Sequence, residues 1–213
     1  MYEPYWPLER LRIVAPLIEL RHPTPEDLSV LAREAAGEEY DPSVPMLASR
    51  DDDPVERGRR TLQWYWQQWA SWRPEHWSLL LSVHHEGLLV GTVNLRARNF
   101  AQLREVETGS WIFPDRQRSG LGTAARQAVL DFAFDGLGAQ YARSASAEDN
   151  AASLRVSEKL GYERDGGERL LMAGDVVPAV RLILSAARWH GARRAGACTV
   201  EGLTECLPLF GLD

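Results

Sequence analysis

The stretch Gln117-Arg118-Ser119-Gly120-Leu121-Gly122-Thr123 (QRSGLGT) separates an alternating segment, residues 104–114, from a segment with helical apolar spacing, residues 121–137. A strand that enters a helix through such a loop brings unpaired backbone N–H groups and the positive end of the helix dipole to one point. Gly120 and Gly122 carry no Cβ, so an anionic group can approach the backbone closely. The stretch therefore predicts an anion-binding loop within an α/β domain.

Two known types of nucleotide-binding loop do not match this stretch in full. A nucleotide P-loop needs Lys and then Ser or Thr after its last glycine, whereas Thr123 and Ala124 follow Gly122. The dinucleotide pattern G-x-G-x-x-A is formally met by Gly120, Gly122 and Ala125, and Glu148 is a possible ribose acceptor. In that pattern the first glycine directly follows the strand, but residues 114–119 intervene here. The dinucleotide interpretation stays the weaker alternative.

The segments on either side of the loop predict the rest of the fold. The apolar patterning predicts two short extended pieces in residues 11–20, a helix capped by Thr24, an aromatic-faced helix in 55–73, a hairpin of 77–84 with 88–96, a strand in 141–147, a helix in 150–160 and a final strand in 180–188. This order predicts a mixed α/β (α+β) fold whose central sheet is antiparallel in its N-terminal half and is flanked by about four helices.

Composition limits the classes of function. The chain has 213 residues and a net charge of −6, which argues against nucleic-acid binding. No stretch approaches the roughly 18 apolar residues of a membrane span, and the first residues do not follow the order of a signal peptide, so the expectation is a cytoplasmic protein without membrane contact. His84 and His85 are adjacent on a strand and face opposite sides, so no metal site is predicted.

The chain is expected to form one domain, residues 1–190, with a C-terminal extension, residues 191–213. The extension carries apolar side chains at Val200, Leu203 and Phe210, which a solvated tail would lack. We therefore expect it to pack on the domain or on a second copy of the chain, and on that basis we expect a homodimer.

Two motifs at a characteristic separation resemble the GNAT superfamily of acyl-CoA N-acyltransferases. The family pattern Q/R-x-x-G-x-G/A is met by Gln117, Gly120 and Gly122, and residues 150–162 (NAASLRVSEKLGY) resemble the family's N-x-x-S and E-K-x-G-F/Y helix. The likeness spans residues 17–189 and is strongest to the branch of ribosomal-protein-alanine acetyltransferases. Residues 6–8 (WPL) and 208–211 (PLFG) also resemble an actinobacterial subgroup of that branch.

The resemblance implies an acyl-CoA co-substrate and a primary amine acceptor, either a peptide N-terminus or a small molecule. It places the CoA pyrophosphate on the backbone amides of the glycine loop and the pantetheine beside the preceding strand. Acetyl-CoA is the family's usual donor. Of the 24 basic residues only Lys159 is lysine, and the abundance of arginine would also allow a carboxylated donor such as succinyl-CoA. The residues expected to contact CoA are Ile112, Phe113, Gln117, Arg118, Ser119, Gly120, Leu121, Gly122, Thr123, Asn150 and Ser153.

Acyl transfer to an amine needs a proton acceptor, and Glu107 is the first candidate, with Glu105 in reserve. Some relatives place a carboxylate just before the pantetheine track. The alternative is an ordinary strand carboxylate that pairs with Arg104 or Arg96. The residues alone leave both interpretations open.

The leaving thiolate needs a hydrogen-bond donor, and Ser153 is the candidate by resemblance, although it can also simply belong to the first turn of the helix. Many superfamily members carry a Tyr seven residues after the helix Asn, where this chain has Ser157. This departure motivates a second hypothesis, a CoA-binding sensor or scaffold without turnover.

Overall fold

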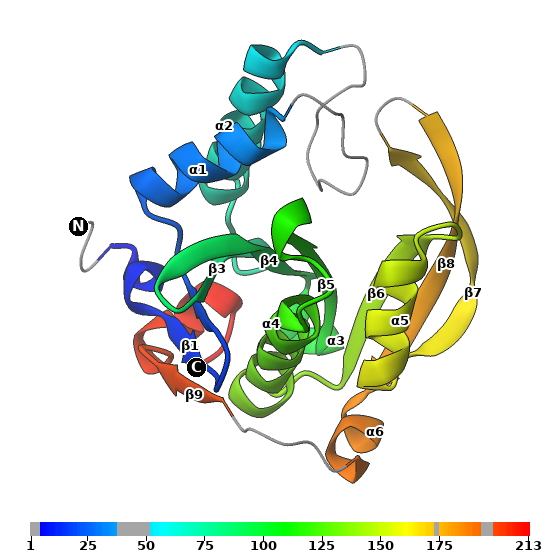
Figure 1. Cartoon of the computed structure of the whole chain (residues 1–213). Helices are drawn as coiled ribbons and strands as arrows, with labels where there is room; N and C mark the ends of the chain where they lie inside the picture. The colour runs from blue at the N-terminus through cyan, green and yellow to red at the C-terminus, as the bar shows by residue number, and fades with distance from the viewer. Residues whose placement is uncertain (1–4, 38–51, 173–174, 193–197) are drawn as a thin grey trace.

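The computed structural model describes residues 5–37, 52–172, 175–192 and 198–213. In this part of the chain one sheet runs in the order β7-β8-β6-β5-β4-β3-β2-β1-β9 (Figure 1). The pairs between β1 and β5 are all antiparallel, which confirms the predicted mixed sheet with an antiparallel N-terminal half. The strands are β1 (Arg12–Val14), β2 (Glu19–Arg21), β3 (His76–His85), β4 (Leu88–Arg98), β5 (Glu105–Ile112), β6 (Tyr141–Ala147), β7 (Glu163–Met172), β8 (Asp175–Ser185) and β9 (Thr199–Glu201).

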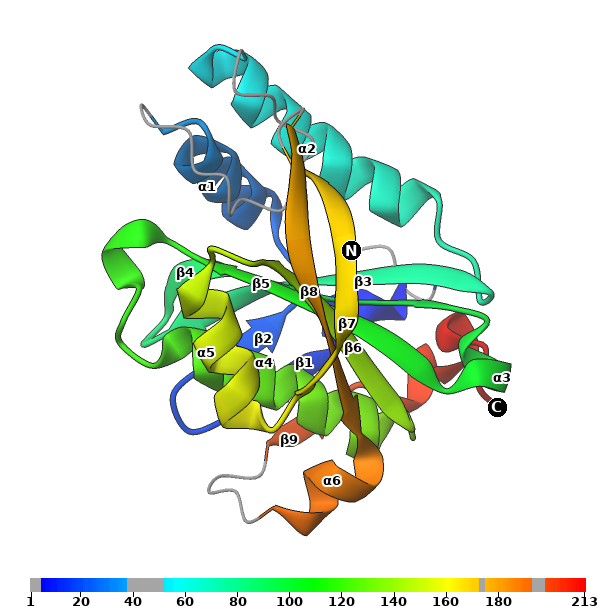
Figure 2. The ribbon, with the colours of Figure 1, turned by 90° about the vertical axis from the view of Figure 1, so that its right-hand side faces the viewer.

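Helices cover both faces of the sheet. Figure 2 shows α1 and α2 on one face and α4 and α5 on the other. The larger apolar core lies on the α4 side and includes Val129 and Phe132, whereas a smaller one on the α1 and α2 side surrounds Tyr65 and Trp111. The helices are α1 (Pro25–Ala35), α2 (Pro54–Ala70), α3 (Phe100–Leu103), α4 (Leu121–Asp131), α5 (Ala151–Leu160) and α6 (Ala186–Gly191). No helix in the described residues is long and apolar enough to cross a membrane.

The start of α1 shows how closely local sequence determines this fold. Thr24 Oγ1 accepts a hydrogen bond from the N–H of Asp27 (3.1 Å), and Asp27 Oδ2 accepts one from the N–H of Thr24 (3.0 Å). These reciprocal bonds satisfy two N–H groups that would otherwise lack a partner at the helix start. The predicted cap of this helix is confirmed.

The two central strands β5 and β6 are parallel and pair over only three residues. Residues 105–107 pair with residues 141–143, after which β5 follows β4 as far as Ile112 and β6 follows β8 as far as Ala147. At the point of separation, Thr108 Oγ1 donates to the carbonyl of Arg143 (3.3 Å) and Ser144 Oγ donates to the carbonyl of Thr108 (3.2 Å). The two strands therefore diverge like the arms of a V, and residues 107–108 of β5 lie at its apex.

The predicted final strand, 180–188, is wrong at both ends. β8 begins earlier, at Asp175, and α6 begins at Ala186, where Ser185 Oγ accepts a hydrogen bond from the N–H of Arg188 (3.2 Å). Pro178 is tolerated inside β8 because its backbone faces the end of β6, where only its carbonyl is engaged, by the N–H of Glu148 (3.1 Å). The strand therefore ends at Ser185, the N-cap of α6, although the apolar pattern continues to residue 188.

β7 was not predicted at all. It lies at the edge of the sheet, most of its side chains are at least partly exposed, and its pairing with β8 shifts register at Gly166 and Gly167. A strand with a bulge and no buried face lacks the apolar alternation on which sequence patterns depend.

The C-terminal residues 198–213 pack against the rest of the described chain. β9 pairs antiparallel with β1 and extends the sheet, and the side chains of Cys206 and Phe210 are buried in the larger core. Trp72 Nε1 donates to the carbonyl of Leu209 (2.8 Å). The apolar side chains of this segment therefore pack on their own chain and no longer argue for a dimer; residues 193–197 of the predicted extension lie outside the described residues.

Candidate functional site

A cavity of about 360 Å³ lies on the α4 and α5 side of the diverging strands. It brings together eight of the residues predicted to contact CoA, from β5, the glycine loop and the start of α5. These are Ile112, Gln117, Arg118, Gly120, Gly122, Thr123, Asn150 and Ser153. The remaining lining residues, which sequence reasoning did not single out, are Ser110, Trp111, Ala152, Arg126, Arg155, Val156 and Lys159.

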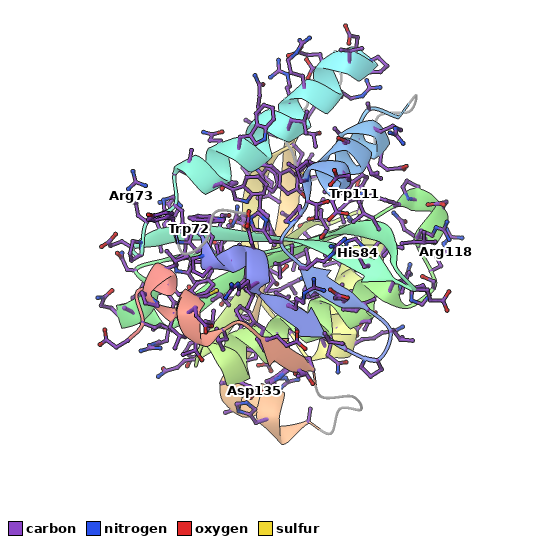
Figure 3. All side chains as sticks on the ribbon, turned by 90° about the vertical axis from the view of Figure 1, so that its left-hand side faces the viewer. Trp72, Arg73, His84, Trp111, Arg118 and Asp135 are labelled. Carbon is purple, nitrogen blue, oxygen red and sulfur yellow. The ribbon has the colours of Figure 1, made fainter. Side chains whose placement is uncertain are left out.

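The glycine loop closes one end of this cavity. Gln117 Nε2 donates to the carbonyl of Ile112 (3.0 Å), which ties the loop to the end of β5. Gly120 is the N-cap of α4 with φ of 87°, in the left-handed region that favours glycine, and it has no side chain to bond the first N–H groups of the helix. These N–H groups and the positive end of the helix dipole are free to bind an anion. Figure 3 shows Arg118 at the periphery of the molecule.

The first turns of α5 form the opposite wall. Asn150 Oδ1 accepts a hydrogen bond from the N–H of Ser153 (3.0 Å), so Asn150 is the N-cap of this helix. Ser153 and Val156 line the cavity at helical spacing. Ser157, the position of the family's Tyr, is fully buried, does not line the cavity, and its hydroxyl finds no partner among the described residues.

Arg126 of α4 lies at the apex of the V and was missed by the sequence analysis. Its side chain is almost fully buried, and burial lowers the pKa of its guanidinium below the ordinary value, partly offset by the hydroxyl of Tyr162. One Nη donates to Thr108 Oγ1 (3.1 Å) and to Ser144 Oγ (3.2 Å), and the other donates to Ser110 Oγ (3.2 Å). The sequence gives no signal for this position, because an arginine next to the apolar stripe of a helix is ordinarily exposed.

Glu107 lies at the apex on the other face of the sheet. Successive strand residues alternate, so Glu107 points away from Thr108 and Arg126, toward the face of α1 and α2. Its carboxylate accepts a hydrogen bond from Arg96 Nε (2.8 Å) in a pair whose side chains are both more than half exposed. Glu105, the reserve candidate, pairs instead with Arg143. Neither carboxylate lines the cavity.

The remaining predicted contacts do not present side chains to the cavity. Phe113 is buried in the smaller core beside Trp111, and Leu121 is buried in the larger one. Ser119 Oγ donates to the carbonyl of Arg116 (2.6 Å) within the loop. These three residues shape the loop and its flanks, and none of them lines the cavity.

The dinucleotide interpretation does not fit this topology. That fold needs a mainly parallel sheet, whereas β5 and β6 form the one parallel pair among the described strands. In addition, a short 3₁₀ turn (Pro114–Arg116) and the residues after it separate β5 from the first glycine.

Comparison with known proteins agrees with the resemblance in the motifs. Three solved structures share the fold at low identity. RimJ from Mycobacterium smegmatis, solved in complex with CoA-disulfide, is 16% identical over 95% of each chain, with a TM-score of 0.72. A putative ribosomal-protein-serine acetyltransferase from Vibrio cholerae is 19% identical over 82% of this chain and 97% of its own, with a TM-score of 0.63. A chimera of the spermidine N-acetyltransferase SpeG from Vibrio cholerae with hSSAT is 18% identical over 83% of this chain and 99% of its own, with a TM-score of 0.64.

The family model described as "Acetyltransferase (GNAT) domain" matches residues 18–163, which is more than half of the chain and includes both motifs. The chain therefore belongs to the GNAT family of acetyltransferases.

Proposed function

We propose that this chain transfers an acyl group from acyl-CoA to a primary amine by direct attack. The observation that carries the proposal is one cavity lined both by the start of α4, at Gly120 and Gly122, and by Arg126, which contacts Thr108 where the two strands diverge. In the reaction the amine nitrogen forms a bond to the thioester carbon and the C–S bond breaks. The amine loses a proton, and the thiolate gains one to become free CoA.

We infer that donor and acceptor approach from opposite faces of the sheet. The donor would lie in the cavity on the α4 and α5 side, with its phosphates at the glycine loop and its thioester at the apex. The acceptor would approach from the α1 and α2 side, where Glu107 is exposed. Backbone N–H groups of β5 beyond Glu107 that do not bond β4 would stabilise the developing oxyanion.

Glu107 would accept the amine proton, directly or through a water molecule. We expect Glu107→Gln to lower kcat on the order of 10²-fold, with little change in CoA affinity, because a positioned base contributes about this much. Arg96→Met is the matched control, since it breaks the same exposed ion pair but leaves the carboxylate. Steady-state kinetics at several pH values measure both. Equal, small losses in the two variants would assign Glu107 a structural role only.

Ser153 would donate a hydrogen bond to the leaving thiolate. Ser153→Ala is expected to lower kcat about 10-fold, in line with the loss of one hydrogen bond to a charged group. Ser157→Ala is the control on the same helix, because its buried hydroxyl has no partner and does not reach the cavity. A rate for Ser153→Ala equal to that of Ser157→Ala would contradict the assignment.

For the acceptor we propose the N-terminal amine of a peptide in preference to a small amine. The support is the likeness of the motifs to the ribosomal-protein-alanine acetyltransferase branch and the shared fold with RimJ. A panel of short peptides with different first residues, tested beside spermidine and simple amines, separates these classes. Activity on small amines alone would overturn the peptide assignment.

Binding is the first test of the proposed function. We expect calorimetric titration to show binding of acetyl-CoA, succinyl-CoA and free CoA, and none of NADH. Failure of every CoA species to bind would overturn the proposal. Binding of CoA species without turnover across the amine panel would favour the second candidate, a CoA sensor or scaffold, which the replacement of the family's Tyr by the buried Ser157 supports.

A further inference from the structure

We propose that Arg126 selects an acyl donor whose acyl group ends in a carboxylate, such as succinyl-CoA, by binding that carboxylate at the apex of the diverging strands. The inference rests on the proposed function and adds the residue that would discriminate between donors. It stands on the burial of the guanidinium, the identity of its partners and its place in the cavity.

The partners of Arg126 are all uncharged. Within the described residues the guanidinium contacts the hydroxyls of Thr108, Ser110, Ser144 and Tyr162, and no carboxylate. Its Nε is buried and has no hydrogen-bond partner there. Arg143 on β6 differs, because it pairs with the carboxylates of Glu105 and Asp165.

A buried charge without a counter-charge is costly, because neutral hydroxyls replace only part of the solvation by water. Arg126 is only 4% exposed, so water does not compensate from outside. The cost is removed when an anion enters the cavity beside it. The guanidinium carries its N–H donors in one plane, a geometry that suits the two oxygens of a carboxylate.

The position of Arg126 points to the acyl end of the donor rather than its phosphates. The phosphates would lie at the glycine loop, where Arg118 and Gly120 line the cavity. Arg126 instead contacts Thr108 and Ser144, the first residues beyond the last pair of β5 and β6. This is where the thioester would lie, so a short acyl chain that extends from it can reach the guanidinium.

The carboxylate takes no part in the bonds that change. The thioester C–S bond still breaks and the C–N bond still forms, and the terminal carboxylate passes unchanged into the amide product. Its role is to hold the acyl chain in place, which makes Arg126 a residue of donor specificity.

Equilibrium titration with three donors tests the proposal without requiring an acceptor. Acetyl-CoA, butyryl-CoA and succinyl-CoA share everything but the acyl group, and butyryl has the same chain length as succinyl with a methyl group in place of the carboxylate. We expect the wild-type chain to bind succinyl-CoA on the order of 10- to 100-fold more tightly than butyryl-CoA, as for one hydrogen-bonded buried charge pair. In Arg126→Met this ratio should fall to about one, with acetyl-CoA affinity retained.

Two further variants separate the proposal from its alternatives. Arg126→Lys keeps the charge without the planar fork and should keep part of the preference. Arg155→Met removes an exposed arginine that lines the same cavity and should weaken all three donors equally.

The wild-type ratio needs no variant, so the test holds even if Arg126→Met does not fold. A wild-type ratio of about one would overturn the inference while leaving the proposed function intact. An equal loss for all donors in Arg126→Met would also overturn it, because Arg126 would then contact the shared pantetheine. If no CoA species binds the wild-type chain, the proposed function fails and the inference with it.

Discussion

Replacing Gly120 with glutamate is expected to lower the affinity for every CoA species by at least about 10³-fold. A carboxylate at the N-cap of α4 would occupy the place of the pyrophosphate, and like charges in contact cost several kcal/mol. A Cβ at Gly120 meets no atom within 4 Å, so the fold has room for the new side chain. Calorimetric titration with free CoA measures the loss.

Gly87 provides a matched control for this variant. It lies in the turn between β3 and β4 with φ of 79°, close to the 87° of Gly120, and a Cβ there also meets no atom within 4 Å. Gly87→Glu therefore carries the same backbone strain and the same added charge, away from the cavity. Equal CoA affinity in the two variants would remove the glycine loop from the site.

The position of the loop between a strand and a helix was predictable because its signals are local. Two glycines, a preceding strand and a following helix place backbone N–H groups at one point whatever the rest of the chain does, so residues 117–123 were identified from the sequence alone. The same holds for the cap of α1, where Thr24 and Asp27 bond each other within one turn.

Features that depend on distant segments were not predictable. The environment of Arg126 is set by hydroxyls from β5, β6 and Tyr162, and no spacing within α4 reveals that these close over the guanidinium. The partner of Glu107 was open between Arg104 and Arg96 until the β4–β5 register placed Arg96 directly opposite. Likewise β9 forms only because β1 offers an edge about 185 residues earlier in the chain.

We propose that residues 198–213 are an integral part of the fold, and Phe210→Ala is expected to lower the free energy of unfolding by about 3–5 kcal/mol. Phe210 is fully buried, with its ring centroid 4.9 Å from that of Trp77, 5.6 Å from Trp72 and 6.1 Å from Phe132. Truncation to alanine leaves a cavity among large rings that cannot move into the space, and it also removes edge-to-face contacts.

Urea unfolding measures this loss as a lower transition midpoint at unchanged slope. Leu171→Ala is the control, since Leu171 is 75% exposed on β7 and its truncation should change the free energy of unfolding by less than about 0.5 kcal/mol. Phe210 does not line the cavity, so the folded variant should bind CoA as the wild-type chain does. A loss below about 1 kcal/mol would show that the C-terminal segment contributes little to the stability of the core. The expected loss would show that β1, β3 and α4 depend on this segment for their packing.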